Sequence, residues 1–266
     1  MTAVWSAPRP QSRTASGRMI SIASGKGGVG KTWLAITLAH ALARMGRRML
    51  LFDGDLGLAN VDVQIGLKPA RDLGAVLAGR LPLKAAALPA ENYGFDVVAG
   101  PSGSGSLALL PAARVQRLAD DLLALAGAYD HAIIDIGAGL DRAVRLLAGA
   151  TDTCLVVTTD EPTALTDAYA FMKMMRADRT AADLGVVVNM AGSERDGERT
   201  HATLAKACES FLRFTPPLLG LVRRDSRVSD AIRAQTPLLT RHPTADAAAD
   251  IEALARRLIA RAASPR

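Results

Sequence analysis

The sequence is poor in cysteine, in histidine and in long apolar runs, and each shortage excludes a class of protein. Cys154 and Cys208 are the only cysteines in 266 residues, and no C-x-x-C motif is present. This excludes a disulfide framework and a thiolate metal cluster. The four histidines are scattered without metal-ligand spacing, so zinc chemistry has no support. No apolar run approaches the ~20 residues of a membrane-spanning helix, and the N-terminus lacks a signal-peptide core. We therefore expect a cytoplasmic protein.

Acidic residues are missing from the first 18 positions, which carry Arg9, Arg13 and Arg18. Residues 251–266 hold four Arg against one Glu, so the two ends, at +3 each, account for the whole net charge of +6. Two interpretations are open: the basic ends solubilise the chain, or they contact nucleic acid or an anionic membrane. Residues 1–17 have too little apolar content to pack, which predicts a disordered basic tail. We expect residues 18–266 to form a single domain.

Short apolar runs recur along the chain and alternate with helical patterns. The runs lie at 19–23, 48–53, 95–98, 131–135, 153–158, 184–189 and 217–222. Because they do not alternate with polar residues, they predict strands that are covered on both faces. Helices are expected where Leu34, Leu38 and Leu42 repeat before Gly46, and over 112–129 and 165–177. The predicted fold class is α/β, with a doubly wound, mostly parallel sheet flanked by helices and ligands at the carboxyl ends of its strands.

The stretch between the first strand and the first helix is the strongest motif in the chain. Residues 24–32 read SGKGGVGKT and contain G-x-x-x-x-G-K-[ST]. Glycines lack a Cβ, so their backbone N–H groups can turn inward and cradle phosphate oxygens at the helix N-terminus. Lys31 would then reach the β- and γ-phosphates, and the Thr32 hydroxyl would ligate Mg²⁺. The predicted nucleotide-binding residues of this loop are Gly25, Lys26, Gly27, Gly28, Val29, Gly30, Lys31 and Thr32.

Three carboxylates are expected at the same edge of the sheet. Asp53 and Asp55 follow the second strand, and Asp135 ends a later one. Phosphoryl transfer to water needs a metal ion on the phosphates and a group that orients the attacking water. We assign the water to Asp55, and metal support to Asp53 and Asp135. Asn189 ends another strand, where its amide can both donate to and accept from adenine.

Lys26 cannot share the role of Lys31, and its place at the rim of the loop leaves its side chain free to face another molecule. The pattern K-G-G-x-G-K-[ST] resembles the phosphate loop of the MinD/ParA family of dimerising ATPases. Residues 52–62 (FDGDLGLANVD) resemble MinD and the FlhG type of flagellar-number regulator, also called FleN or YlxH, more than ParA. Residues 135–139 (DIGAG) and 159–169 (TDEPTALTDAY) resemble the FlhG type. The resemblance covers about residues 19–262.

The resemblance implies an ATP- and Mg²⁺-dependent homodimer that hydrolyses ATP slowly, with Lys26 acting in trans on the partner's nucleotide. The energy of the cycle would regulate flagellar number or placement through an FlhF-like GTPase, flagellar C-ring proteins or a flagellar transcription regulator. Such a protein is cytoplasmic or peripheral at the inner membrane or the cell pole. Two rival interpretations are a positioning ATPase for chromosome, plasmid or pilus cargo, and a nucleic-acid-binding module whose dimerisation ATP controls.

The chain departs from the family pattern at three places. The N-terminal D-Q-A motif of many FlhG proteins is missing. The usual I-P-x-D near adenine reads Val222-Arg223-Arg224-Asp225, so either Arg223 stacks on adenine or the base is selected less strictly. At the C-terminus, the apolar stripe formed by Ile251, Leu254, Leu258 and Ile259 lacks aromatic residues. We expect that stripe to pack in the core and not to bind a membrane.

Overall fold

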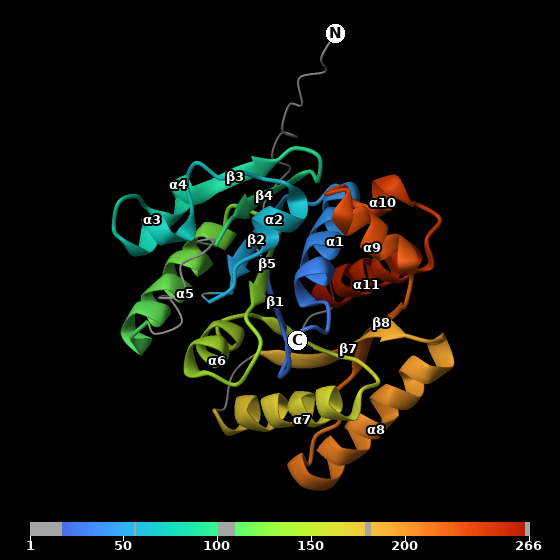
Figure 1. The fold of residues 1–266 in the computed structure, drawn as a ribbon. Helices are drawn as coiled ribbons and strands as arrows, with labels where there is room; N and C mark the ends of the chain where they lie inside the picture. Colours follow the sequence, from blue (N-terminus) through green and yellow to red (C-terminus); the bar gives the residue numbers. More distant parts are fainter. Residues whose placement is uncertain (1–17, 56, 101–109, 179–181, 264–266) are drawn as a thin grey trace.

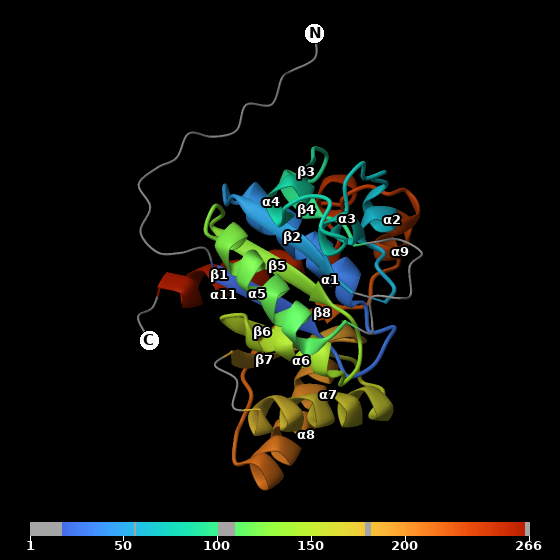
Figure 2. The same cartoon turned by 90° about the vertical axis from the view of Figure 1, so that its left-hand side faces the viewer.

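An eight-stranded sheet lies between two layers of helices in the computed structural model (Figures 1 and 2). The structure describes residues 18–55, 57–100, 110–178 and 182–263. The predicted disordered tail, with Arg9 and Arg13, lies outside these residues. The strands are β1 (Arg18–Ala23), β2 (Met49–Gly54), β3 (Ala87–Ala90), β4 (Phe95–Val98), β5 (His131–Ile136), β6 (Thr153–Thr158), β7 (Asp183–Ala191) and β8 (Leu218–Arg223).

The strand order is β3-β4-β2-β5-β1-β6-β7-β8. Among the described strands, only the β3–β4 pair is antiparallel. The predicted doubly wound, mostly parallel sheet is therefore confirmed. In a parallel sheet the carboxyl ends of neighbouring strands meet at one edge. The ends of β1, β2 and β5 thus lie side by side, which brings their following loops together.

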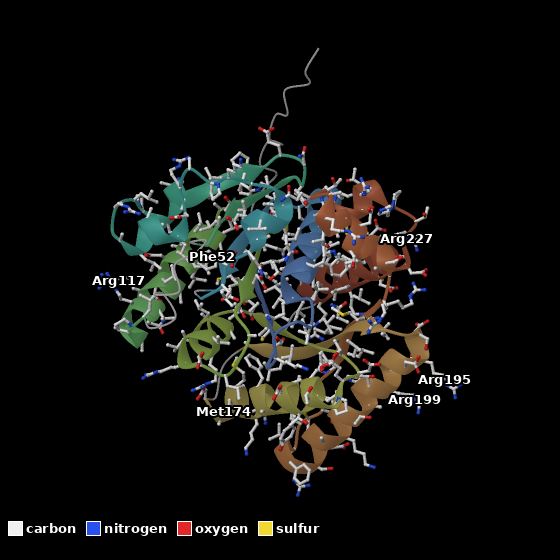
Figure 3. The ribbon with its side chains drawn as sticks, in the orientation of Figure 1. Phe52, Arg117, Met174, Arg195, Arg199 and Arg227 are labelled. Carbon is white, nitrogen blue, oxygen red and sulfur yellow. The ribbon has the colours of Figure 1, made fainter. Side chains whose placement is uncertain are left out.

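Each face of the sheet carries its own buried apolar cluster. One face is covered by α1 (Lys31–Arg44), α2 (Val61–Ile65), α9 (Ser226–Arg233), α10 (Leu238–Arg241) and α11 (Asp246–Ala263). The other is covered by α3 (Leu73–Leu77), α4 (Leu83–Ala86), α5 (Ala112–Ala126), α6 (Arg142–Gly149), α7 (Pro162–Ala177) and α8 (Glu194–Leu212). Figure 3 shows the contrast between core and surface: Phe52 lies inside, while Arg195 and Arg199 point outward from α8.

The seven predicted strands are present, and the differences concern element ends and one short edge strand. The first helix ends before Gly46, whose φ of +78° is the left-handed conformation expected there. The predicted 112–129 helix stops at Ala126 because two tight turns follow it. The predicted 165–177 helix begins earlier, at Pro162, which suits a first helical position. Strand β3 was not expected.

The C-terminal helix α11 packs in the core, as predicted. Ile251, Leu254 and Leu258 are at most 5% exposed and belong to the cluster that also holds α1. The Arg18 guanidinium donates to the Ala262 carbonyl oxygen at 2.8 Å, which joins the start of β1 to the end of α11. Among the described residues, no helix has both the length and the apolar character that crossing a membrane requires.

Candidate nucleotide-binding site

The phosphate loop connects β1 to α1 and curls back on itself. Gly28 and Gly30 have φ of +83° and +84°, a left-handed backbone that glycine adopts without the steric cost of a Cβ. The Ser24 hydroxyl donates to the Lys26 carbonyl oxygen at 2.6 Å, which closes the first half of the loop. Gly30 directly precedes Lys31, the first residue of α1. The loop therefore ends at a helix N-terminus, where unpaired N–H groups favour an anion.

Two glycines of the loop are also required by close packing. A Cβ on Gly25 would lie 2.2 Å from the Asp167 carbonyl oxygen of α7, and one on Gly30 would lie 2.5 Å from the Asn189 side-chain nitrogen. That nitrogen donates to the Val29 carbonyl oxygen at 2.8 Å. Neighbouring elements thus hold the loop on both sides, which fixes its shape before any ligand binds.

Lys31 lies beneath the loop and faces two carboxylates. It is 9% exposed, and burial lowers its pKa while Asp135 and Asp55 oppose that shift. A buried ammonium group needs compensating negative charge. The arrangement suits a lysine that contacts phosphate oxygens, since phosphates would supply further negative charge at this point.

Asp53 and Asp135 are opposite one another in the register of β2 and β5. Both are at most 2% exposed, and burial raises the pKa of Asp53 to about 6 and that of Asp135 to about 7. Hydrogen bonding with Thr32 opposes the shift of Asp135, whose Oδ1 atom has no hydrogen-bond partner. A buried carboxylate oxygen without a partner, beside Thr32, is a natural contact for a hydrated cation.

The carboxylates of Asp53 and Asp55 also shape the loop that follows β2. Asp53 accepts hydrogen bonds from the backbone N–H groups of Asp55, Asn60 and Val61, at 3.1–3.2 Å. Asp55 accepts from those of Gly57 and Leu58, at 3.1 and 2.9 Å. This structural role has no signature in the sequence. Both carboxylates therefore hold the backbone of the loop at its start and at residues 57–58 and 60–61, while Asp55 itself lies half-buried near Lys31.

The loop after β5 touches both of its neighbours. A Cβ on Gly137 would lie 3.1 Å from an Asp55 carboxylate oxygen, so this loop passes directly beside that side chain. The Gly139 N–H donates to the Ser24 carbonyl oxygen at 3.0 Å. The three loops after β1, β2 and β5 are consequently in mutual contact, and a ligand at one of them would act on all three.

Lys26 lies at the rim of the site and turns toward the start of α7. Its Nζ atom is 2.6 Å from Glu161 Oε2 and 2.9 Å from Thr163 Oγ1, and its side chain remains 37% exposed. Hydrogen bonding with Lys26 lowers the pKa of Glu161. Sequence reasoning missed Glu161 and Thr163 as partners of this lysine. The only signal was that both belong to the 159–169 stretch on which the resemblance partly rests.

The residues assigned to adenine lie farther along the same edge and already have protein partners. The Asn189 amide nitrogen donates to the Val29 carbonyl oxygen, as described above. The Arg223 guanidinium contacts Asp250 at 2.8 Å and Asp246 at 3.1 Å, both on α11. Asn189 therefore packs against the phosphate loop, whereas Arg223 is held by α11. The predicted residues that the structure brings together are Lys31, Thr32, Asp53, Asp55 and Asp135. The roles of Asn189 and Arg223 toward adenine stay predictions.

The combined groups can bind a triphosphate and a divalent cation. Backbone N–H groups and Lys31 are suited to phosphate oxygens, and the Thr32 hydroxyl and Asp135 are suited to a cation. Within the described parts of the chain, no cluster of three or more His, Cys, Asp or Glu side chains could hold a metal ion alone.

Known proteins that resemble this chain include nucleotide-binding proteins and regulators of flagella. A family profile described as the CobQ/CobB/MinD/ParA nucleotide binding domain matches residues 20–238. The antiactivator FleN of Pseudomonas aeruginosa is 35% identical over 241 residues, which span 91% of this chain and 86% of FleN. The flagellum site-determining protein YlxH of Helicobacter pylori is 32% identical over 193 residues, which span 73% of this chain and 65% of YlxH.

A solved structure supports the same assignment. The septum site-determining protein MinD of Pyrococcus horikoshii, in complex with Mg-ADP, superposes with a TM-score of 0.77 at 27% identity. The match covers 93% of this chain and 98% of that one. From the matched profile, the FleN relationship and the phosphate loop described above, we conclude that this chain belongs to the MinD/ParA family of P-loop ATPases, and that the family resemblance seen in its sequence is confirmed.

Proposed function

We propose that this protein is a regulatory ATPase whose ATP-bound form is a homodimer and whose cycle sets the number or placement of flagella. The observation that carries the enzymatic part is the group of buried charges at the phosphate loop. Lys31 and Asp135 are buried and Asp55 is half-buried, and the two carboxylates face Lys31 at the carboxyl edge of the sheet. Charges are rarely buried unless a ligand or a partner compensates for them. A nucleotide triphosphate with its cation has the charge and size to do so.

The roles of the residues follow from their positions. Lys31 and the backbone N–H groups of residues 25–31 hold the phosphates, and Thr32 and Asp135 hold the cation. When bound, Mg²⁺ neutralises charge that develops on the β- and γ-oxygens. Asp55 lies near Lys31. Its carboxylate accepts a hydrogen bond from the attacking water and thereby orients the water for attack. Asp53 keeps the loop of Asp55 in shape through its three backbone hydrogen bonds.

Dimerisation is supported by what the site leaves exposed. Leu58 and Leu140 are 80% and 37% exposed, and they follow Asp55 and Gly139 in the two loops around the phosphate site. A second copy closing over this edge would cover both leucines. Lys26 lies at the same rim in an exposed ion pair, and solvent screens such a pair so that it contributes little to stability. Lys26 can therefore exchange Glu161 for a phosphate of the partner's nucleotide at small cost.

The flagellar part of the proposal rests on the relatives that are named for it. FleN is named as an antiactivator, and YlxH as a determinant of the flagellum site. We infer a corresponding partner for this protein: an FlhF-like GTPase, a flagellar C-ring protein or a flagellar transcription regulator. The rival that the comparisons keep open is a MinD-like positioning ATPase with another cargo. A location in the cytoplasm or peripherally at the inner membrane or pole belongs to the same proposal.

Lys26→Ala should abolish ATP-dependent dimerisation while nucleotide binding persists. The lysine lies at the rim and not beneath the loop, so the phosphate cradle stays intact. Light scattering of the purified protein with ATP and Mg²⁺ should give a dimer mass for the parent chain and a monomer mass for the variant. Lys173→Ala, an exposed lysine of α7, is the matched control and should dimerise normally. A Lys26→Ala dimer of parental stability would contradict the role in trans.

Asp55→Asn should bind ATP and dimerise but lower the hydrolysis rate by roughly 100-fold or more. The amide oxygen can still accept from Gly57 and Leu58, so the loop keeps its shape, while the negative charge that orients water is lost. Single-turnover hydrolysis measured with saturating ATP checks this, and the dimer should persist for correspondingly longer. Turnover at the parental rate would remove Asp55 from the mechanism.

Asp135→Asn should stabilise the nucleotide-free protein and weaken its response to Mg²⁺. At pH 8 the buried carboxylate is charged, and its Oδ1 atom has no partner, whereas the amide carries no charge. Removing this penalty of about 1 kcal/mol or more should raise Tm by about 2–4 °C for a chain of this size. Calorimetry gives Tm, and ATP binding with Mg²⁺ or with EDTA gives the metal response. Asp121→Asn, exposed on α5, is the control; a lower Tm and an unchanged Mg²⁺ effect would refute the assignment.

The physiological role is tested by deleting the gene in the source organism and counting flagella by electron microscopy. We expect the number or position of flagella to change, and the parental gene to restore them. Complementation with the Lys26→Ala variant should fail because the dimer is the active form. Unchanged flagella, together with mislocalised chromosome, plasmid or pili, would favour the rival positioning role.

A further inference from the structure

The C-terminus of α9 has an unusual residue at a position that normally favours glycine. Thr236 N–H donates to the Ala231 carbonyl oxygen and Gln235 N–H to that of Ile232, at 3.1 and 3.0 Å. This is the Schellman pattern, which requires a left-handed residue after the helix. Gln235 occupies that place with φ of +49°. A residue with a Cβ is disfavoured there, which directs attention to what the Gln235 side chain contacts.

The Gln235 side chain crosses to α2, the short helix that follows Asp55 and its loop. Its Nε2 atom donates to the Val63 carbonyl oxygen at 2.7 Å. The approach is close: a Cβ on Gly66 would lie 3.0 Å from Gln235 Oε1, and Gly66 is itself left-handed, with φ of +69°. The left-handed backbone of Gln235 and that of Gly66, one on each side of the contact, therefore allow this amide to reach the end of α2.

The contact adds a second attachment, at the C-terminal turn, to a short helix. At its N-terminus, α2 is held by Asp53, which accepts from the N–H groups of Asn60 and Val61. Helix α2 has only five residues, too few to be stable alone; its Val61 and Ile65 are buried in the core, whereas Val63 is 59% exposed. The Val63 carbonyl oxygen accepts from the Gly66 N–H at 3.4 Å, and the shorter bond from Gln235 is its second contact.

We propose that Gln235 is a positioning residue for ATP hydrolysis, because it fixes α2 and thereby the Asp55 loop that begins the same segment. Asp53 holds the N-terminal turn of α2 and Gln235 holds its C-terminal turn, so the helix at which the Asp55 loop ends is fixed at both ends. Loss of the second contact lets α2 shift, and Asp55 then spends less time at the position where it orients water. This inference rests on the proposed ATPase function of the site.

Two variants separate the hydrogen bond from the backbone strain. Gln235→Glu keeps the size and the left-handed strain but replaces the amide donor by a carboxylate. Gln235→Gly removes the donor and relieves the strain. Both should lower kcat roughly fivefold, which corresponds to ~1 kcal/mol for one hydrogen bond. KM for ATP should stay unchanged, because neither the phosphate loop nor its lysines are altered.

Arg213→Gly is the matched control, since Arg213 ends α8 with the same left-handed backbone, at φ of +52°, away from α2. Its kcat should equal that of the parent. Hydrogen exchange of residues 61–67 in the nucleotide-free protein should accelerate in both Gln235 variants and not in the control. This measurement needs no ATPase activity, so it tests the anchor even if the parent chain hydrolyses nothing, an outcome that would refute the proposed function instead.

A merely structural role predicts a different set of results. It would make the loss of kcat follow the loss of Tm, so Gln235→Gly, with its relaxed backbone, should then be nearly as active as the parent. We expect instead that Gln235→Gly keeps or raises Tm while kcat falls as far as in Gln235→Glu. Parental kcat in either variant, or unchanged exchange of residues 61–67, would overturn the proposal.

Discussion

The burial of titratable groups whose charge the chain compensates only in part is the constraint on which the rest of the structure depends. Asp53, Asp135 and Lys31 are all at most 9% exposed; the two carboxylates lie at the ends of adjacent strands, and Lys31 begins the helix that follows the phosphate loop. Isolated charges are costly in a protein interior, and the Asp135 oxygen without a partner carries part of that cost. The fold tolerates the arrangement because a rigid parallel sheet leaves these residues no other position. An apolar or neutral ligand would leave the cost in place, whereas a phosphate with its cation removes it.

The same constraint explains why the surrounding loops are in contact. Asp53 serves as an anchor for the segment of Asp55, Gly137 passes beside Asp55, and Gly139 is bonded to the phosphate loop. A change of charge at the phosphates therefore acts on loops that carry the exposed side chains of Leu58 and Leu140, through one or two intervening contacts. A switch requires such an element with two arrangements that differ little in free energy. Residues 57–66 are held by a few hydrogen bonds, among them those to Asp55, Asp53 and Gln235, whereas the central strands are paired with neighbours on both sides.

The sequence was sufficient for the layers of the fold and for the phosphate loop, because buried parallel strands and glycine-rich loops both leave local patterns. Strand β3 left none: it has four residues, includes Pro89, and lies at the sheet edge, where proline is tolerated. Contacts between distant residues were equally invisible. The partners of Lys26 are about 135 residues away in the sequence. Arg223 ends strand β8, whereas its partners lie on helix α11. No sequence spacing predicts either set of contacts. Asn189 was predicted at the correct edge, but its contact with the Val29 carbonyl oxygen depends on how two loops pack.

The two lysines of the phosphate loop show how burial divides their tasks. Lys31 is buried among carboxylates, and its removal would leave those charges uncompensated in every state of the protein. Lys26 is paired with an exposed glutamate, and water and salt screen that pair. A side chain that must change partners during a cycle needs an interaction that is weak enough to break, yet oriented enough to hold it near the rim. The start of α7 provides such an interaction, because Glu161 and Thr163 bind Lys26 from one side only and leave over a third of the side chain accessible.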